Sequence, residues 1–257
     1  MWYESVIPEE DFQKLDFAQR DAALLQGTTI SNENQGDFPK TVLEETTSIE
    51  SLSVNDFSLE NCYIDDSGNL IAEEGAQLAL PLLKKGSDEG EYLFSLTIAS
   101  KDDSQYYLTV NGKEQLVMPS TYAWRYPLND YSFKIPTEDE QILCEITPGT
   151  YEISNVRLAW SSYSEARRWI SERNKVNLED LKVSPDHISG KIQSQSAGIL
   201  VLSMPYSDGW SCLVDGKEHP TILANHAFLG IELEPGQHEI ELTFFPKMLR
   251  IGLAVTG

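Results

Sequence analysis

Gly198-Ile-Leu-Val-Leu-Ser-Met-Pro-Tyr-Ser-Asp-Gly-Trp210 begins with an apolar run and ends in a turn. The run Ile199–Met204 is typical of a strand that is buried on both faces. Two Asp-Gly pairs, at 208–209 and 215–216, tolerate positive φ and therefore predict tight turns. The stretch thus predicts antiparallel β-structure at the C-terminal end of the chain.

Alternating apolar and polar residues extend this pattern to both sides. Ile240, Leu242 and Phe244 alternate with polar residues, and Asn111-Gly112 is a strong hairpin signal. Further strand-like runs lie at 92–98, 106–110, 131–135, 142–146 and 151–160. The chain is therefore expected to be mainly β, with two antiparallel β-sandwiches: a jelly-roll-like one over residues 53–160 and a smaller, Ig-like one over residues 176–247.

Two helical segments are predicted beside these sandwiches. Asp16 is suited to cap a helix over Phe17–Gln26, and Gly27 suits the position after its end. Residues 1–52 are therefore expected to form a helical entry segment and connector. Ser162-Tyr-Ser-Glu165 matches a capping box, which predicts a linking helix within residues 161–175.

The composition is strongly acidic. The chain has 41 acidic and 19 basic residues among 257, a formal net charge of −22. Nucleic-acid binding is not expected, because neutralising phosphates requires basic patches. Docking on an anionic membrane surface is disfavoured for the same reason. We expect most of these charges to lie on a solvated surface.

The cysteines and the two ends of the chain are the features that could indicate a cellular compartment. Cys62, Cys144 and Cys212 are an odd number without framework spacing, so we expect buried apolar fillers at 144 and 212 and no disulfide framework. The N-terminus lacks the basic and apolar regions of a signal peptide. Met248–Gly257 is apolar but only about half of the ~20 residues that a membrane-spanning helix needs. We expect residues 248–257 to be the stub of a membrane helix.

Motifs that carry catalysis are absent from the sequence. There is no Gly-x-Ser-x-Gly elbow, phosphate loop or zinc-ligand spacing, and we expect no metal and no cofactor. Asp65-Asp-Ser-Gly-Asn69 lacks the spacing of a calcium loop and is interpreted as a hairpin turn. With so many carboxylates, no acid–base pair can be selected, and no catalytic residue is predicted.

One aromatic cluster is a candidate carbohydrate-binding site. Exposed rings can stack on the apolar faces of sugars while neighbouring polar side chains bond the hydroxyls. The simpler alternative is that the rings pack into the core or a domain interface. The candidate residues are Tyr122, Trp124, Tyr126, Asn129 and Asp130.

Segments at both ends of the chain resemble a known family. The C-terminal segments are Leu200–Trp210, Val214-Asp-Gly-Lys217, Ala227-Phe-Leu-Gly230 and Pro235-Gly-Gln-His238. At the N-terminus, Glu10-Asp-Phe-Gln-Lys-Leu15 and Gln19–Gln26 add to the pattern. Together these segments resemble YfhO-type bacterial membrane proteins, in which the C-terminal pattern precedes the final membrane helix.

The resemblance to this family implies an activity for the protein of which the chain would be a part. YfhO-type proteins are polytopic and similar to glycosyltransferases that take a sugar from a polyprenyl-phosphate donor and decorate teichoic-acid-type surface polymers. Their catalytic acidic residues lie in loops near N-terminal membrane helices, so none is carried over to this chain. The motif positions are expected to be structural: Pro205, Tyr206, Gly209, Trp210, Asp215 and Gly216.

Three hypotheses follow. In the first, the chain is the extracytoplasmic, non-catalytic region of such a membrane protein, and it positions the acceptor. Its partners would be the remainder of its own protein and a cell-surface polysaccharide or teichoic acid. The second is a free carbohydrate-binding module, and the third is a purely structural or interaction domain.

Overall fold

The computed structural model describes the chain in two compact units. Unit 2 is Thr46–Glu165, and it is inserted into unit 1, which combines Met1–Glu45 with Ala166–Gly257. All strand pairs in the three sheets are antiparallel, so the mainly-β, antiparallel prediction is confirmed. The described residues are 1–30, 38–45, 47–82, 89–122 and 129–246.

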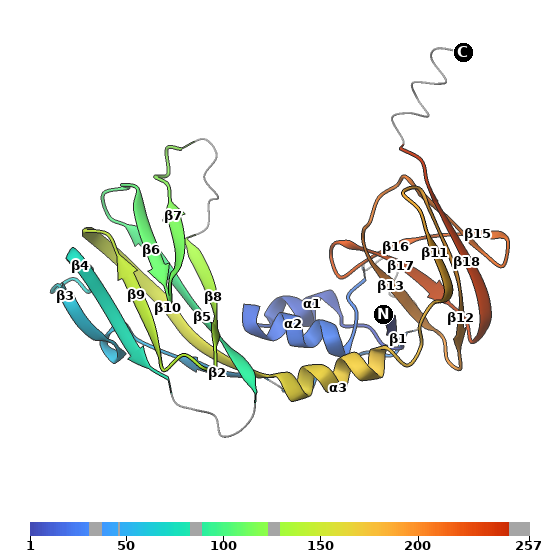
Figure 1. Ribbon diagram of the computed structural model, residues 1–257, viewed down its shortest axis with the longest axis horizontal. Helices are drawn as coiled ribbons and strands as arrows, with labels where there is room; N and C mark the ends of the chain where they lie inside the picture. Colours follow the sequence, from blue (N-terminus) through green and yellow to red (C-terminus); the bar gives the residue numbers. More distant parts are fainter. Residues whose placement is uncertain (31–37, 46, 83–88, 123–128, 247–257) are drawn as a thin grey trace, which may run out of the picture. The chain divides into compact units, whose positions relative to one another are not determined.

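The described strands of unit 2 form one nine-stranded sheet (Figure 1). Its main path runs β7-β6-β9-β4-β10-β5-β8, while β2 pairs with β10 and β3 with β4. A short 3-10 helix, Val54–Asp56, lies between β2 and β3. The strands are β2 (Thr47–Ser51), β3 (Ser58–Ile64), β4 (Leu70–Pro81), β5 (Gly90–Ser100), β6 (Tyr106–Val110), β7 (Lys113–Val117), β8 (Asp130–Pro136), β9 (Gln141–Ile146) and β10 (Gly149–Ser162).

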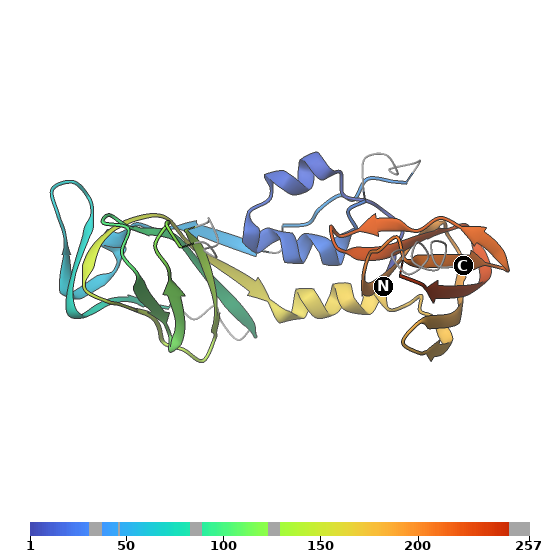
Figure 2. The same ribbon diagram turned by 90° about the horizontal axis from the view of Figure 1, so that it is seen from above.

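The sheet of unit 2 curls into a nearly closed barrel (Figure 2). Strand β4 pairs with β10 before Gly75 and with β9 after it, and Gly75 has a φ of +73° that an L-residue rarely adopts. Lys113 on β7 donates to the backbone oxygen of Lys134 on β8, which brings the two ends of the sheet together. The bend and this contact let one sheet enclose a core.

The core of unit 2 follows the predicted alternation. On β5 the buried side chains are Tyr92, Phe94, Leu96 and Ile98, each at most 5% exposed, while the residues between them are half-buried. Burial of such rings and aliphatic chains is the main stabilising contribution in a unit of this size. The strand predicted over residues 92–98 is therefore confirmed.

Two predicted hairpin turns are present in unit 2. Asn111 and Gly112 have φ of 44° and 75° between β6 and β7, the positive values that a two-residue hairpin requires. Between β3 and β4, the Asp65 carboxylate accepts hydrogen bonds from the backbone nitrogens of Ser67 and Asn69. The acidic segment 65–69 is therefore a self-bonded turn, as predicted.

Unit 1 contains a β-sandwich of two sheets. One sheet has the order β1-β13-β17-β16 and the other β11-β12-β18-β14-β15. Side chains from both sheets share one buried cluster that includes Leu200, Leu229 and Leu242. The strands are β1 (Trp2–Tyr3), β11 (Glu179–Val183), β12 (His187–Ser194), β13 (Gly198–Pro205), β14 (Trp210–Val214), β15 (Lys217–His219), β16 (Ile222–Ala224), β17 (Phe228–Leu233) and β18 (Gly236–Phe244).

The N-terminal segment is an integral part of this sandwich. Trp2 and Tyr3 pair with Leu200 and Ile199 on β13, and the amino group of Met1 donates to the backbone oxygen of Val201 at 2.8 Å. The side chains of Trp2 and Tyr3 are 4% and 1% exposed. The first residues of the chain thus supply an edge strand and two large core side chains to a sheet formed by its last third.

The helix predicted over Phe17–Gln26 is present as α2, after the short helix α1 (Glu9–Lys14). Asp16 and Gln19 form a capping box at its start, which confirms the predicted cap. Gly27 has an extended φ of −154° and not the left-handed conformation of a C′ glycine. Glycine fits here for a different reason: an added Cβ would lie 2.1 Å from Oγ1 of Thr41.

The second predicted helix is α3 (Tyr163–Arg173). Arg173 near its end donates through Nε to the backbone oxygen of Leu25 at 3.0 Å and through Nη2 to that of Gln26. These are carbonyl groups at the end of α2 that lack partners within the helix. Figure 2 shows α2 and α3 side by side, as these hydrogen bonds from Arg173 require.

The expected stub of a membrane helix, residues 248–257, lies outside the described residues. Within the described ranges, no helix has both the length and the apolar character needed to cross a bilayer.

Candidate functional site

Unit 1 contains an open cleft of about 910 Å³. This volume is within the range of small-molecule sites. Its walls come from the N-terminal segment, the β12–β13 turn, the β14–β15 hairpin, the end of β17 and the β17–β18 turn. The lining residues are Glu4, Phe38, Pro39, Ser196, Ala197, Val214, Asp215, Lys217, Glu218, His219, Glu232, Leu233, Glu234 and His238.

The cleft is acidic and rich in hydrogen-bond acceptors. Among its described lining residues, five carboxylates stand against a single lysine, Lys217. Such a field repels anions and favours ligands that bring donors or positive charge. Phe38, Pro39 and Leu233 add apolar surface. The arrangement suits a small ligand rich in donor groups and disfavours a polyphosphate chain.

The best-defined polar pair in the cleft joins Asp215 to His238. Asp215 Oδ2 lies 2.8 Å from His238 Nδ1, and Asp215 Oδ1 accepts from the backbone nitrogen of Glu239 at 2.9 Å. The other ring nitrogen of His238 lies 3.0 Å from the backbone oxygen of Glu234. One imidazole therefore bridges the β14–β15 turn and the β17–β18 turn.

The charges of this pair stabilise each other. The hydrogen bond to Asp215 raises the pKa of His238 above its usual value, against a smaller opposing effect of burial. The pKa of Asp215 is lowered, first by the backbone hydrogen bond from Glu239 and then by the bond from His238. Both shifts favour the ionised forms of the two side chains.

His219 and Glu232 form a second polar group in the cleft wall. Burial raises the pKa of Glu232, and His219 partly offsets this effect. The Nε2 atom of His219 is buried and has no hydrogen-bond partner among the described residues. Nowhere in the described ranges do three or more His, Cys, Asp or Glu side chains assemble as metal ligands.

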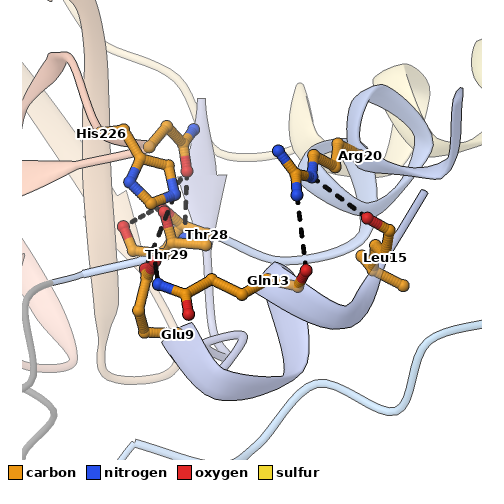
Figure 3. A network of polar contacts seen from close by, with 8 residues as sticks. Glu9, Gln13, Leu15, Arg20, Thr28, Thr29 and His226 are labelled. Carbon is orange, nitrogen blue, oxygen red and sulfur yellow. Dashed lines mark hydrogen bonds and ion pairs between the residues drawn. The ribbon is translucent and has the colours of Figure 1, made fainter. Parts of the chain in front are cut away.

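A separate polar network fastens the N-terminal helices to the β16–β17 turn (Figure 3). Asn225 Oδ1 accepts from Thr28 Oγ1 and from the Thr29 backbone nitrogen, and His226 Nε2 lies 3.6 Å from Glu9. The ring of His226 also lies 5.1 Å from that of Phe12. Because these residues bond one another across the fold, we interpret the network as structural.

The predicted aromatic cluster is only partly described. Trp124 and Tyr126 lie outside the described residues, and Tyr122 is 46% exposed. Asp130 accepts from Thr97 Oγ1 at 2.5 Å, and the backbone oxygen of Asn129 accepts from Ile98. Asn129 and Asp130 are thus bonded to strand β5, and a sugar site at this cluster remains a prediction.

The structure brings the C-terminal motif segments together in pairs. The backbone nitrogen of Tyr206, which follows Pro205, donates to the oxygen of Ala227 at 2.8 Å, so the first segment meets the third. The Asp215–His238 bond likewise joins the second segment to the fourth. Gly216 completes the turn of the second segment with a φ of 74°.

Most of the cleft could not be found from the sequence. Glu4, His219, Glu232 and His238 come from segments that are far apart in the chain, and no motif links them. The one available signal was that Val214-Asp-Gly-Lys217 and Pro235-Gly-Gln-His238 both belong to the resemblance. Their shared position on the cleft appears only in the fold.

Cysteine chemistry offers no second site. Cys144 and Cys212 are buried, and burial raises the pKa of their thiols to about 12 and about 11. Thiols that stay protonated at neutral pH are poor nucleophiles and poor ligands. All three cysteines are free, and those at 144 and 212 fill the cores as predicted.

Two solved structures resemble this fold weakly. The C-terminal CBM6 of LamC, a marine laminarinase from Zobellia galactanivorans, is 16% identical, with a TM-score of 0.26 over 44% of this chain and 98% of that one. A conserved protein of unknown function from Pseudomonas aeruginosa PAO1 is 12% identical, with a TM-score of 0.19 over 77% of this chain and 93% of that one. Likenesses of this size do not bear on function.

Sequence comparison is decisive for the family. The profile described as bacterial membrane protein YfhO matches residues 1–256. The YfhO protein of Bacillus subtilis (strain 168) is 21% identical over 256 residues, which cover 98% of this chain and 29% of the relative. The chain thus spans under a third of the length of that relative. It belongs to the YfhO family of bacterial membrane proteins.

Proposed function

We propose that this chain is the extracytoplasmic, non-catalytic region of a polytopic membrane glycosyltransferase that modifies cell-surface polymers of the teichoic-acid type. In this role it holds the acceptor near an active site that the rest of the protein supplies. Its partners are then the remainder of its own protein and the polymer.

The observation that carries this proposal is the family match over residues 1–256, in a chain whose described part is two β-units. Membership of a membrane-protein family is compatible with a β-rich region whose described helices do not cross a bilayer if that region lies outside the membrane. Three of the described aspartates, Asp65, Asp130 and Asp215, are each bonded within their own turn or sheet, which supports structural roles for these three side chains.

Charge limits how the acceptor is held. The net charge of −22 and the acidic cleft both repel a polyanion. Screening at physiological salt weakens this repulsion beyond about 8 Å. The chain is therefore expected to guide the polymer through its shape and through uncharged sugar groups, and not to bind phosphate tightly.

The test is sugar transfer by the full-length protein in membrane vesicles, with a polyprenyl-phosphate sugar as donor and a teichoic acid as acceptor. The variants Glu218→Gln and Glu232→Gln remove carboxylates of the cleft with little change in shape. We expect both to retain transfer within about threefold of the wild type, because a group that does not act in the transition state costs little when replaced.

Two results would contradict the proposal. Absence of transfer by the wild-type protein would remove the glycosyltransferase assignment. Loss of transfer by more than about a thousandfold in one variant, at unchanged abundance in the membrane, is the size expected for a catalytic group and would place catalysis in this chain.

A further inference from the structure

The ring of His238 is bonded at both of its nitrogens. Nδ1 lies 2.8 Å from Asp215 Oδ2, and Nε2 lies 3.0 Å from the backbone oxygen of Glu234. Both partners are acceptors only, whereas a neutral imidazole has one donor and one acceptor nitrogen. Only the protonated ring can donate to both partners at once. The geometry therefore selects the charged form of His238.

This ring joins two hairpin turns that line the cleft. Asp215 has a φ of 53° in the β14–β15 turn, and its second oxygen accepts from the Glu239 backbone on β18. Glu234 precedes β18 in the β17–β18 turn. The ring itself is largely shielded, with 17% of its side chain exposed. A proton on His238 thus bears directly on how two walls of the cleft are held.

The surrounding charges also favour that proton. Beyond the two turns, Glu4, Glu218 and Glu232 also line the cleft, so its carboxylates outnumber its one described lysine, Lys217. The charged and titratable groups that line the cleft with His238 are Glu4 after β1, Asp215 and Lys217 at the β14–β15 turn, Glu218 and His219 on β15, Glu232 on β17 and Glu234 in the β17–β18 turn, and of these Asp215 and Glu234 raise the pKa of the ring.

We propose that His238 is a proton-dependent joint of the cleft: its imidazolium holds the β14–β15 turn against the β17–β18 turn, and loss of the proton loosens that wall. The neutral ring keeps only one of the two bonds, because one nitrogen must then present a lone pair to an acceptor, either the Asp215 carboxylate or the backbone oxygen of Glu234. The repulsion at that nitrogen opens one of the two contacts that the ring makes. This inference goes beyond the proposed function and does not depend on it.

The experiment is a pH titration of the 257-residue chain by NMR, which follows the imidazole nitrogens of His238 and the backbone amides of 214–219 and 239. We expect the midpoint of His238 to lie above the ordinary histidine value of 6.5 and the hairpin amides to shift with the same midpoint. Unit 2 contains no histidine, so its amides are the internal control.

Asp215→Asn is the decisive variant, because asparagine tolerates the same positive φ and preserves the turn. We expect it to bring the midpoint of His238 down toward 6.5 and to abolish the coupled shift of the hairpin amides. If that variant alters the fold, His238→Gln provides a second test: its hairpin amides should no longer shift with the midpoint that His238 shows in the wild type, and a persisting shift at that midpoint would overturn the proposal. A wild-type midpoint at or below 6.5, or hairpin amides that do not follow it, would overturn the proposal.

Discussion

The ring of Trp210 lies 5.0 Å from that of Phe244, with an angle of 48° between their planes. The two residues face each other across the β14–β18 pair, and Gly209 precedes Trp210. A Cβ on Gly209 would lie 2.5 Å from Phe244 Cε2. The Gly-Trp pair of the motif is therefore explained by packing: glycine leaves room for the ring that tryptophan contacts.

This packing predicts the cost of changing either residue. Trp210→Ala should lower the free energy of unfolding of unit 1 by about 3 kcal/mol, the lower end of the range for large aromatic deletions, because the ring is only partly buried. Gly209→Ala should also destabilise the unit, since Phe244 must move. Hydrogen exchange of β18 amides measures both effects.

Ser211→Ala is the matched control for these variants. Ser211 is exposed on the same strand, and its replacement should stay within about 0.5 kcal/mol of the wild type. Equal effects of Trp210→Ala and Ser211→Ala would show that the aromatic pair is not a stabilising contact.

Arg168 and Arg173, two of the three arginines of α3, should differ sharply in importance. Arg173 is half-buried and donates to Leu25 and Gln26, so Arg173→Ala should cost about 2–3 kcal/mol by removing charged hydrogen bonds from the end of α2. Arg168 forms an exposed pair with Glu44, and Arg168→Ala should cost less than about 1 kcal/mol. Urea unfolding followed by hydrogen exchange in α2 compares the two variants. Equal losses of stability in the two variants would show that the hydrogen bonds of Arg173 to the end of α2 do not stabilise the fold.

Cysteine alkylation provides a separate stability probe for each unit. Cys144 lies in the core of unit 2 and Cys212 in that of unit 1, and burial raises both thiol pKa values, to about 12 and about 11. Both should react with an alkylating agent only when their unit opens, whereas the partly buried Cys62 should react sooner. Mass spectrometry of the labelled peptides follows each site.

The opposite order of alkylation would contradict the structure. Alkylation of Cys144 as fast as that of Cys62 in the native chain would mean that the core of unit 2 is open to solvent. In that case the closed sheet described for the unit would be wrong.

Proton linkage at His238 predicts how the stability of unit 1 varies with pH. The pKa of His238 is raised in the folded state. The stabilising contribution of this side chain to the free energy of unfolding is therefore fully present below the unfolded pKa of 6.5, and it is lost as pH rises through the folded pKa. The free energy of unfolding of unit 1 should therefore fall from mildly acidic to alkaline pH. Denaturation followed by unit-resolved hydrogen exchange should show a smaller fall in His238→Gln. An identical pH profile in that variant would refute the linkage.

Local patterns were sufficient to predict much of the fold. The alternation at Tyr92–Ile98, the Asn111-Gly112 turn and the Asp16 cap depend on neighbouring residues, so the sequence displays them directly. The pairing of Trp2 with Leu200 joins residues that are far apart in the chain. A strand of two residues is too short to show an alternation of apolar and polar side chains. This pairing was therefore not predictable from the sequence.

The candidate cleft was less predictable than the fold for a related reason. Asp215 is recognisable as a turn residue, but its carboxylate acquires a role only when His238 is placed 2.8 Å away. The carboxylates of the cleft cannot be distinguished from 41 acidic residues by composition. A site built by long-range packing becomes visible only when the sheets are assembled.

The most direct test of the proposed location uses a cysteine on the exposed β3–β4 turn of the full-length protein. Ser67→Cys, in a Cys62→Ser background, places a thiol on an exposed turn while Cys144 and Cys212 remain buried. Cells are treated with a membrane-impermeant maleimide before and after permeabilisation, and the Cys62→Ser parent gives the background. An extracytoplasmic chain predicts full labelling of Ser67→Cys in intact cells, and labelling only after permeabilisation would contradict it.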